Sequence, residues 1–178
     1  MQLELHPSMG MDGSRSNAVV FCAAPSGWHS IGIDAGSDAA FALEGSDLQA
    51  GHTVYLHVET FSHGGTRLPF GPAQHSFVYV KAAQDGPIRE CKPVAAFNGG
   101  GNGQLRVWRL LSQGDDYYFT FFRRGETVIE IYLRAHDIDD MKPYIASLQD
   151  AARSVQVVEG RQTRHSGAGD SQIKKEQL

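Results

Sequence analysis

The stretch that decides the fold runs over residues 116–158 and reads DYYFTFFRRGETVIEIYLRAHDIDDMKPYIASLQDAARSVQVV. Its first part is an alternating run of aromatic and β-branched residues, which fits a pleated strand. Gly125 follows two arginines and precedes a second alternating run. A glycine at the second central position suits a two-residue turn, because that position needs a positive φ. The stretch therefore predicts a β-hairpin with Arg124 and Gly125 at the centre of its turn.

The second strand of this hairpin alternates clearly between two sets of side chains. Successive side chains of a strand point to opposite faces of the sheet. One set is apolar and the other is mixed, which predicts a strand with one face on a core and one face largely exposed to water. The apolar set is Ile129, Ile131 and Leu133, and the mixed set is Val128, Glu130, Tyr132 and Arg134.

An amphipathic helix follows the hairpin. Asp140 is the expected N-cap, because this places Pro143 in the first turn, where its missing N–H has no intrahelical partner to lose. Apolar residues recur at steps of three and four and form one stripe along the helix. That stripe is Ile138, Met141, Ile145, Leu148 and Ala152. A short closing strand is expected over Ser154–Val158.

The first half of the chain adds several shorter strands and few helices. Residues 70–83 fit either a strand or a helix. Runs of strands with few helices favour an α+β domain with a central antiparallel β-sheet over alternating βαβ units. The expected strands cover residues 18–24, 38–44, 52–61, 88–97 and 104–112.

Length and charge limit the organisation and the partners. The 178 residues predict a flexible segment over residues 1–17, one α+β domain over 18–158 and a disordered, polar tail over 159–178. The net charge of −4 provides no broad basic surface for nucleic acid. No apolar run reaches the roughly 18–20 residues of a transmembrane helix.

Several short motifs together resemble the PsbP-type fold superfamily. That superfamily includes a photosystem II extrinsic protein, a Ran-binding nuclear-import factor and many bacterial extracytoplasmic proteins of unknown role. The motifs are Pro25–Trp28, Leu43–Ser46, Val54–Val58, Gly114–Asp116 and Ala151–Val155.

The resemblance implies a central antiparallel sheet flanked by helices. It also implies a non-enzymatic binding or accessory role, through protein or small-ligand contacts. It further implies a periplasmic or secreted location. The given chain shows no signal peptide, so a cytoplasmic location stays open.

His57 and Glu59 carry the alternative hypothesis, a small metal-dependent hydrolase. They share one face of the strand expected at 52–61, whereas His52 lies on the other face. A catalytic zinc centre usually takes three protein ligands and a water, and no third ligand accompanies these two. We therefore expect no catalytic constellation and no metal.

No cofactor is expected either. The glycine-rich run Asn98–Gly103 has no lysine and no following helix, so it fits a hairpin loop better than a P-loop or a dinucleotide fingerprint. The remaining candidate is a basic patch that would dock an acidic protein partner, with a solvated surface as the alternative. The patch would consist of Arg106, Arg109, Arg123 and Arg124.

Cys22 and Cys91 are the only cysteines, and neither has the spacing of a reactive pair. We expect two free thiols, since nothing in the sequence brings their strands together. A disulfide stays open as the alternative, because an extracytoplasmic location would permit one.

Overall fold

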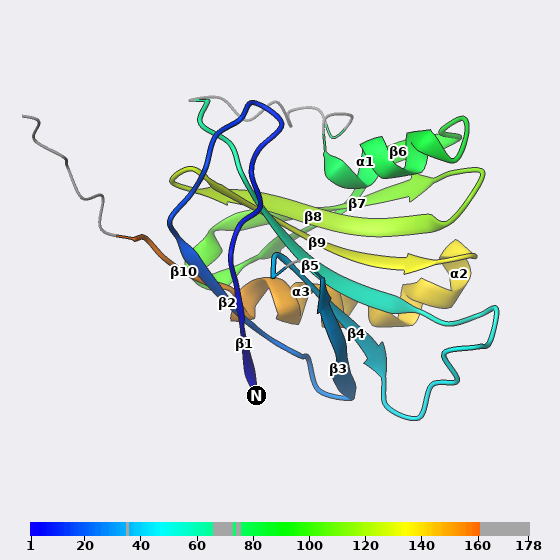
Figure 1. The fold of residues 1–178 in the computed structure, drawn as a ribbon. Coiled ribbons are helices and arrows are strands. Elements are labelled where there is room, and N and C mark those ends of the chain that lie inside the picture. Colours follow the sequence, from blue (N-terminus) through cyan, green and yellow to red (C-terminus); the bar gives the residue numbers. More distant parts are fainter. Residues whose placement is uncertain (35, 66–72, 74–75, 161–178) are drawn as a thin grey trace, which may run out of the picture.

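The computed structural model describes residues 1–34, 36–65, 73 and 76–160. Its centre is a seven-stranded sheet with the order β3-β4-β5-β9-β8-β7-β6, and every neighbouring pair is antiparallel. The α+β class and the antiparallel sheet are therefore confirmed (Figure 1). The strands are β3 (Trp28–Asp34), β4 (Asp38–Leu43), β5 (Tyr55–Ser62), β6 (Glu90–Asn98), β7 (Gln104–Leu111), β8 (Asp116–Arg124) and β9 (Thr127–Ala135).

Helices lie on both sides of this sheet (Figure 1). The side covered by α1 (Phe77–Gln84) is called the α1 face below. The opposite side, the α3 face, is covered by α2 (Ile138–Met141), the 3-10 turn η3 (Lys142–Tyr144) and α3 (Ile145–Ser154). A further 3-10 turn, η2 (Gly100–Asn102), joins β6 to β7. No helix in the described part of the chain is long and apolar enough to cross a membrane.

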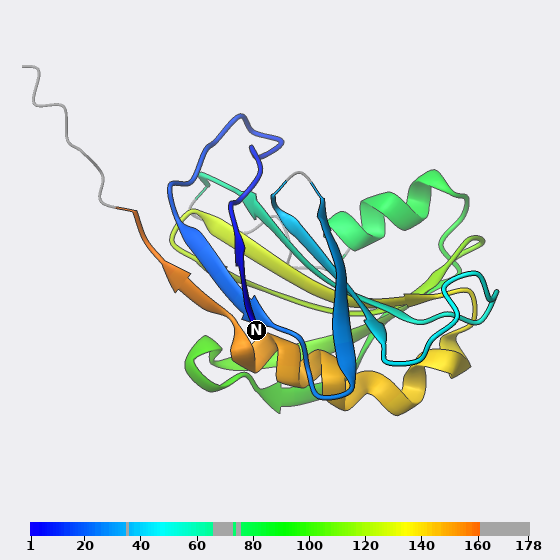
Figure 2. The ribbon, with the colours of Figure 1, turned by 60° about the horizontal axis from the view of Figure 1, so that its bottom comes forward.

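The N-terminal segment is not flexible throughout, so the expectation for residues 1–17 is wrong at its start. β1 (Gln2–Leu5) pairs with β2 (Val19–Ala23), which also pairs with β10 (Gln156–Val158) (Figure 2). Leu5 is fully buried and lies opposite Val20, so this short strand contributes to the core. Four residues alternate too briefly to stand out as a strand in the sequence.

The predicted hairpin forms, but its turn lies one residue later than expected. Arg124 pairs with Thr127, which leaves Gly125 and Glu126 as the two turn residues. Gly125 has a φ of 56°, so the glycine occupies the first central position and not the second. A positive φ is readily adopted by glycine because it has no Cβ.

The expectation of a largely wet face on β9 is also wrong. β9 lies between β5 and β8, in the interior of the sheet, and α1 covers the face that was expected to be wet. Ile129, Ile131 and Leu133 belong to the core under α3, as expected. On the other face Val128, Glu130 and Tyr132 are buried as well.

The helix begins earlier than predicted. Asp137 is the N-cap, and its side chain accepts a hydrogen bond from the Asp139 N–H at 2.8 Å. Asp140 lies inside α2. Pro143 lies in η3, because proline cannot continue the α-helical hydrogen-bond ladder. The apolar stripe is oriented as expected, with Ile138 and Ile145 partly buried and Met141, Leu148 and Ala152 fully buried.

The ambiguous segment 70–83 contains a helix. Residues 77–83 belong to α1, while residues 70–72 and 74–75 lie outside the described residues. The Ser76 side chain caps α1 by accepting a hydrogen bond from the Tyr79 N–H at 3.1 Å. The tail expected to be disordered lies outside the described residues from position 161 onward.

Asp116 connects three segments and provides a test of the fold. Its carboxylate accepts hydrogen bonds from the N–H groups of Ser112 and Ile138, both at 3.1 Å, and its side chain is 6% exposed. Asp116→Ala leaves both N–H groups without this acceptor, and that of Ser112 is buried, so we expect a loss of about 2 kcal/mol in the free energy of unfolding. Urea denaturation measures this loss. Asp115→Ala is the control, because Asp115 is more exposed; an equal loss in the control would contradict the assignment.

Candidate functional site

The α1 face is only partly covered. Val78 and Ala82 of α1 pack on side chains of β7, β8 and β9, and the part of the face toward β3 stays open. A hollow of about 320 Å³ lies on this open part. We call it the shelf. It is lined by Ile31, Gly32, Ile33, Asp38, Ala40 and His57.

Strand register brings these residues together. Gly32 of β3 lies opposite Ala40 of β4, and Ala40 lies opposite His57 of β5. The first two have little or no side chain, so the hollow opens above them. The sheet register shifts between Ser30 and Gly32, which places Ile31 at an irregularity of the edge strand.

His57 is held firmly at the inner end of the shelf. Its Nδ1 lies 3.2 Å from Asp38 Oδ1, and its ring stacks on Tyr132 with a centroid distance of 4.7 Å and an interplanar angle of 7°. A carboxylate beside an imidazole can orient a general base. However, His57 Nε2 is buried and has no hydrogen-bond partner among the described residues, so no nucleophile is bonded to it.

A second polar group links α1 to the sheet. Lys81 of α1 places its Nζ 2.8 Å from Glu59 Oε2 and donates to the Tyr132 hydroxyl at 3.2 Å. Burial raises the pKa of Tyr132, and the nearby carboxylates of Asp38 and Glu59 raise it further. The phenol therefore stays protonated and serves as a hydrogen-bonding group. This arrangement ties α1 to β5 beside the shelf.

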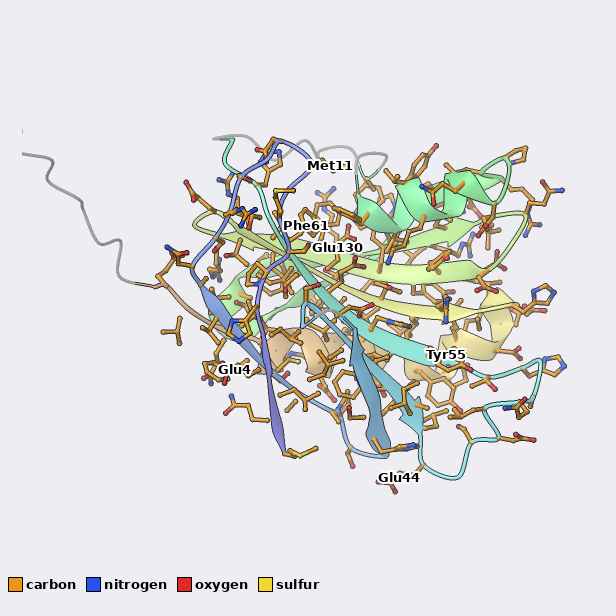
Figure 3. All side chains as sticks on the ribbon, viewed as in Figure 1. Glu4, Met11, Glu44, Tyr55, Phe61 and Glu130 are labelled. Carbon is orange, nitrogen blue, oxygen red and sulfur yellow. The ribbon has the colours of Figure 1, made fainter. Side chains whose placement is uncertain are left out.

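Glu130 lies behind this group and is fully buried. It is directly opposite Glu59 in the register of β5 and β9. Its carboxylate accepts hydrogen bonds from the N–H groups of Phe77 and Val78, at 3.0 and 3.3 Å, at the start of α1. Figure 3 shows Glu130 beside Phe61, whereas Tyr55 lies farther along β5.

The environment of Glu130 favours its neutral form. Burial, followed by the charge of Glu59, raises the pKa of Glu130 to about 8, and the two backbone hydrogen bonds oppose that rise. The sequence analysis missed this residue as a functional candidate, because Glu130 was assigned to a wet face. The pairing of β5 with β9, which aligns it with Glu59, comes from the structure, and no motif in the sequence pointed to it.

The two residues of the hydrolase hypothesis do share a face. Both His57 and Glu59 lie on the α1 face, but each is engaged by a different partner, Asp38 and Lys81. His52 lies elsewhere, 3.1 Å from Asp140. Within the described residues no group of three or more His, Cys, Asp or Glu side chains is arranged to hold a metal ion.

The four arginines of the expected basic patch do not lie together. Alternation along β7 and β8, with Arg109 opposite Tyr118, puts Arg106 and Arg123 on the α1 face and Arg109 and Arg124 on the α3 face. The prediction treated neighbouring strands as one surface and ignored this alternation. A single docking patch built from all four is therefore not formed.

Three of these arginines also have partners within the protein. Arg109 donates to both Glu90 carboxylate oxygens, at 2.9 and 3.0 Å. Arg123 donates to the carbonyls of His63, Gly65 and Gly125, and Arg124 donates to that of Gly101. These contacts support loops and a neighbouring strand.

The two cysteines are free and lie in different environments. Cys22 is buried in the core under α3, and burial raises its pKa to about 12. Cys91 packs against the cluster under α1, and burial, followed by the charge of Glu90, raises its pKa. Both thiols are thus protonated near neutral pH, which makes them poor nucleophiles.

Comparison with known proteins identifies the fold. No family model matches the chain, and no curated protein matches its sequence. Among solved structures, the Ran-binding protein Mog1p of Saccharomyces cerevisiae aligns with a TM-score of 0.52 and 9% identity, covering 89% of this chain and 96% of that one. LpqN of Mycobacterium tuberculosis, involved in cell envelope biogenesis, aligns with a TM-score of 0.54 and 10% identity, covering 89% and 91%.

Cyanobacterial PsbP from Synechocystis aligns with a TM-score of 0.50 and 13% identity, covering 88% of this chain and 92% of that one. The chain therefore has a PsbP-type fold, and the resemblance seen in the sequence is confirmed at the level of the fold. At these identities the likeness shows the fold alone.

Proposed function

We propose that the protein is a non-enzymatic binding domain that takes a protein partner on the shelf. The observation that carries this proposal is an exposed apolar side chain at the rim of the shelf, because Ile31 is 38% exposed and lines the same hollow as the Asp38 carboxylate. Apolar side chains that surround a few fixed polar groups are typical of binding sites. His57 and Glu59 serve in this proposal to shape and rigidify the shelf.

The comparisons support a binding role without specifying the partner. Mog1p is described as a Ran-binding protein, and LpqN as involved in cell envelope biogenesis. The first supports recognition of another protein, and the second supports a location outside the cytoplasm. Because one fold hosts many functions, the shelf itself has to carry the assignment. Fractionation of the natural host, probed with an antibody, tests the location; recovery only with the cytoplasmic fraction would contradict it.

Site-specific photo-crosslinking in the natural host tests the binding role. A photoreactive phenylalanine analogue at Ile31 is expected to give one discrete adduct, because this side chain would lie in the interface. The same analogue at Val94, which is 40% exposed on the opposite edge of the sheet, is the matched control and should give none. Equal labelling at both positions, or none at Ile31, would contradict the proposal.

A further inference from the structure

The two edges of the central sheet are protected unequally. Edge strands expose unpaired backbone groups, and proteins usually shield them with proline or charged residues. At one edge, β6 carries Glu90, Lys92 and Pro93, and proline has no N–H to donate. At the other edge, β3 reads WHSIGID; like β6 it contains a register shift, but it has neither proline nor lysine nor arginine. β3 is therefore the edge that is suited to pairing with another strand (Figure 2).

Because Gly32 has no side chain, the surface of β3 has an open position between the edge of the sheet and the shelf. Gly32 lies between two exposed isoleucines, and a Cβ added to it would meet nothing within 4 Å. Ala40 continues the gap on β4, and the hollow ends at Asp38 and His57. A side chain from outside β3 can therefore cross the strand at Gly32 and reach a carboxylate.

The charge at the end of this path is acidic. The Asp38 side chain is 18% exposed, and its Oδ1 contacts His57 Nδ1 at 3.2 Å. Nearby cations have other partners: Lys81 lies 2.8 Å from Glu59, and Arg134 lies over the Tyr55 ring. Asp38 is therefore available for a cation supplied by a partner.

We propose that β3 accepts an extended strand of the partner protein, and that a lysine or arginine of that strand crosses Gly32 to pair with Asp38. This inference rests on the proposed function. An added strand would lie roughly 10 Å from β4, twice the spacing between neighbouring strands, so only a long side chain spans the distance. Backbone pairing would supply affinity, and the basic side chain would supply specificity.

Two synthetic heptapeptides serve as probes, one of alternating valine and lysine and one of alternating valine and glutamate. The full chain is titrated with each, and amide hydrogen exchange is followed by NMR. We expect the lysine peptide to bind and to slow exchange in residues 29–33, while residues 90–96 of the other edge are unaffected. The glutamate peptide is expected not to bind.

Two substitutions separate edge pairing from general attraction to a negatively charged protein. Gly32→Val fills the gap and is compatible with the backbone there, so we expect at least tenfold weaker binding of the lysine peptide by an otherwise folded protein. Gly101→Val, at another open glycine, is the control and should bind normally. Asp38→Asn should weaken binding by about tenfold, as expected for loss of one charged partner at an interface.

The outcomes distinguish this inference from the proposed function. Binding without protection of residues 29–33, or equal binding by Gly32→Val, overturns strand addition. If neither peptide binds but the adduct at Ile31 forms in cells, the proposed function holds and the basic strand is wrong. If the adduct is also absent, both fail.

Discussion

Raising the pH from about 5 to about 9 is expected to lower the free energy of unfolding, with Glu130 as the main source. The pKa of this carboxyl rises from 4.5 to about 8 on folding, so the folded state binds its proton more tightly. Its stabilising contribution is complete below 4.5 and is lost as the pH rises through 8. A shift of this size corresponds to at most about 5 kcal/mol. Chemical denaturation across this pH range measures the loss.

Glu130→Gln should remove most of this pH dependence. The amide does not titrate, but its nitrogen cannot accept, so the N–H of Phe77 or Val78 loses an acceptor. The free energy of unfolding of the variant is therefore expected to be lower than that of the wild type at low pH and close to it at high pH. Glu126→Gln, on the exposed hairpin turn, is the matched control and should keep the wild-type profile. Parallel profiles for all three proteins would exclude Glu130 as the source.

Leu148→Asp is expected to cost at least about 4 kcal/mol in the free energy of unfolding. Leu148 is fully buried on the face of α3 that packs against the sheet. The substitution removes apolar contacts and introduces a carboxylate into the core. Thermal and urea unfolding should show a large loss, or the variant should fail to accumulate in folded form.

Ala146→Asp provides the control for this substitution, because Ala146 is exposed on the same helix. It introduces the same carboxylate and should change stability by less than about 1 kcal/mol. Similar losses for both variants would mean that helix propensity, and not burial, determines the effect.

The sequence predicted the fold well where a pattern was long. The hairpin of β8 and β9, the stripe of α3 and the antiparallel sheet follow from periodicity over many residues. Boundaries and short elements were less predictable. β3 contains a glycine and a register shift, so its alternation is broken and no strand was expected there. The helix start at Asp137 was missed because Pro143 was expected in the first turn.

The candidate site was less predictable than the fold. His57 and Glu59 could be placed on one face, since that follows from a spacing of two within one strand. The positions of Asp38 and Gly32 in the shelf depend on how β3, β4 and β5 are aligned with one another. The sequence does not specify this register. Likewise, Glu130 is buried only because α1 crosses above it, and α1 lies in the segment whose structure was ambiguous. To predict that the four arginines are divided between the two faces of the sheet, the alternation along both β7 and β8 would have had to be considered together.

The pairing of β2 with β10 has a consequence for how the chain acquires its structure during synthesis. Val19 of β2 lies opposite Val158 of β10. β2 is synthesised early, but this edge of β2 stays unpaired until Val158, one of the last described residues, has been synthesised. Contacts so distant in sequence form late and slow folding. We therefore expect a nascent chain that ends before β10 to leave β2 exposed on the ribosome. Its buried Val20 and Cys22 would then be accessible to chaperones until translation of β10 is complete.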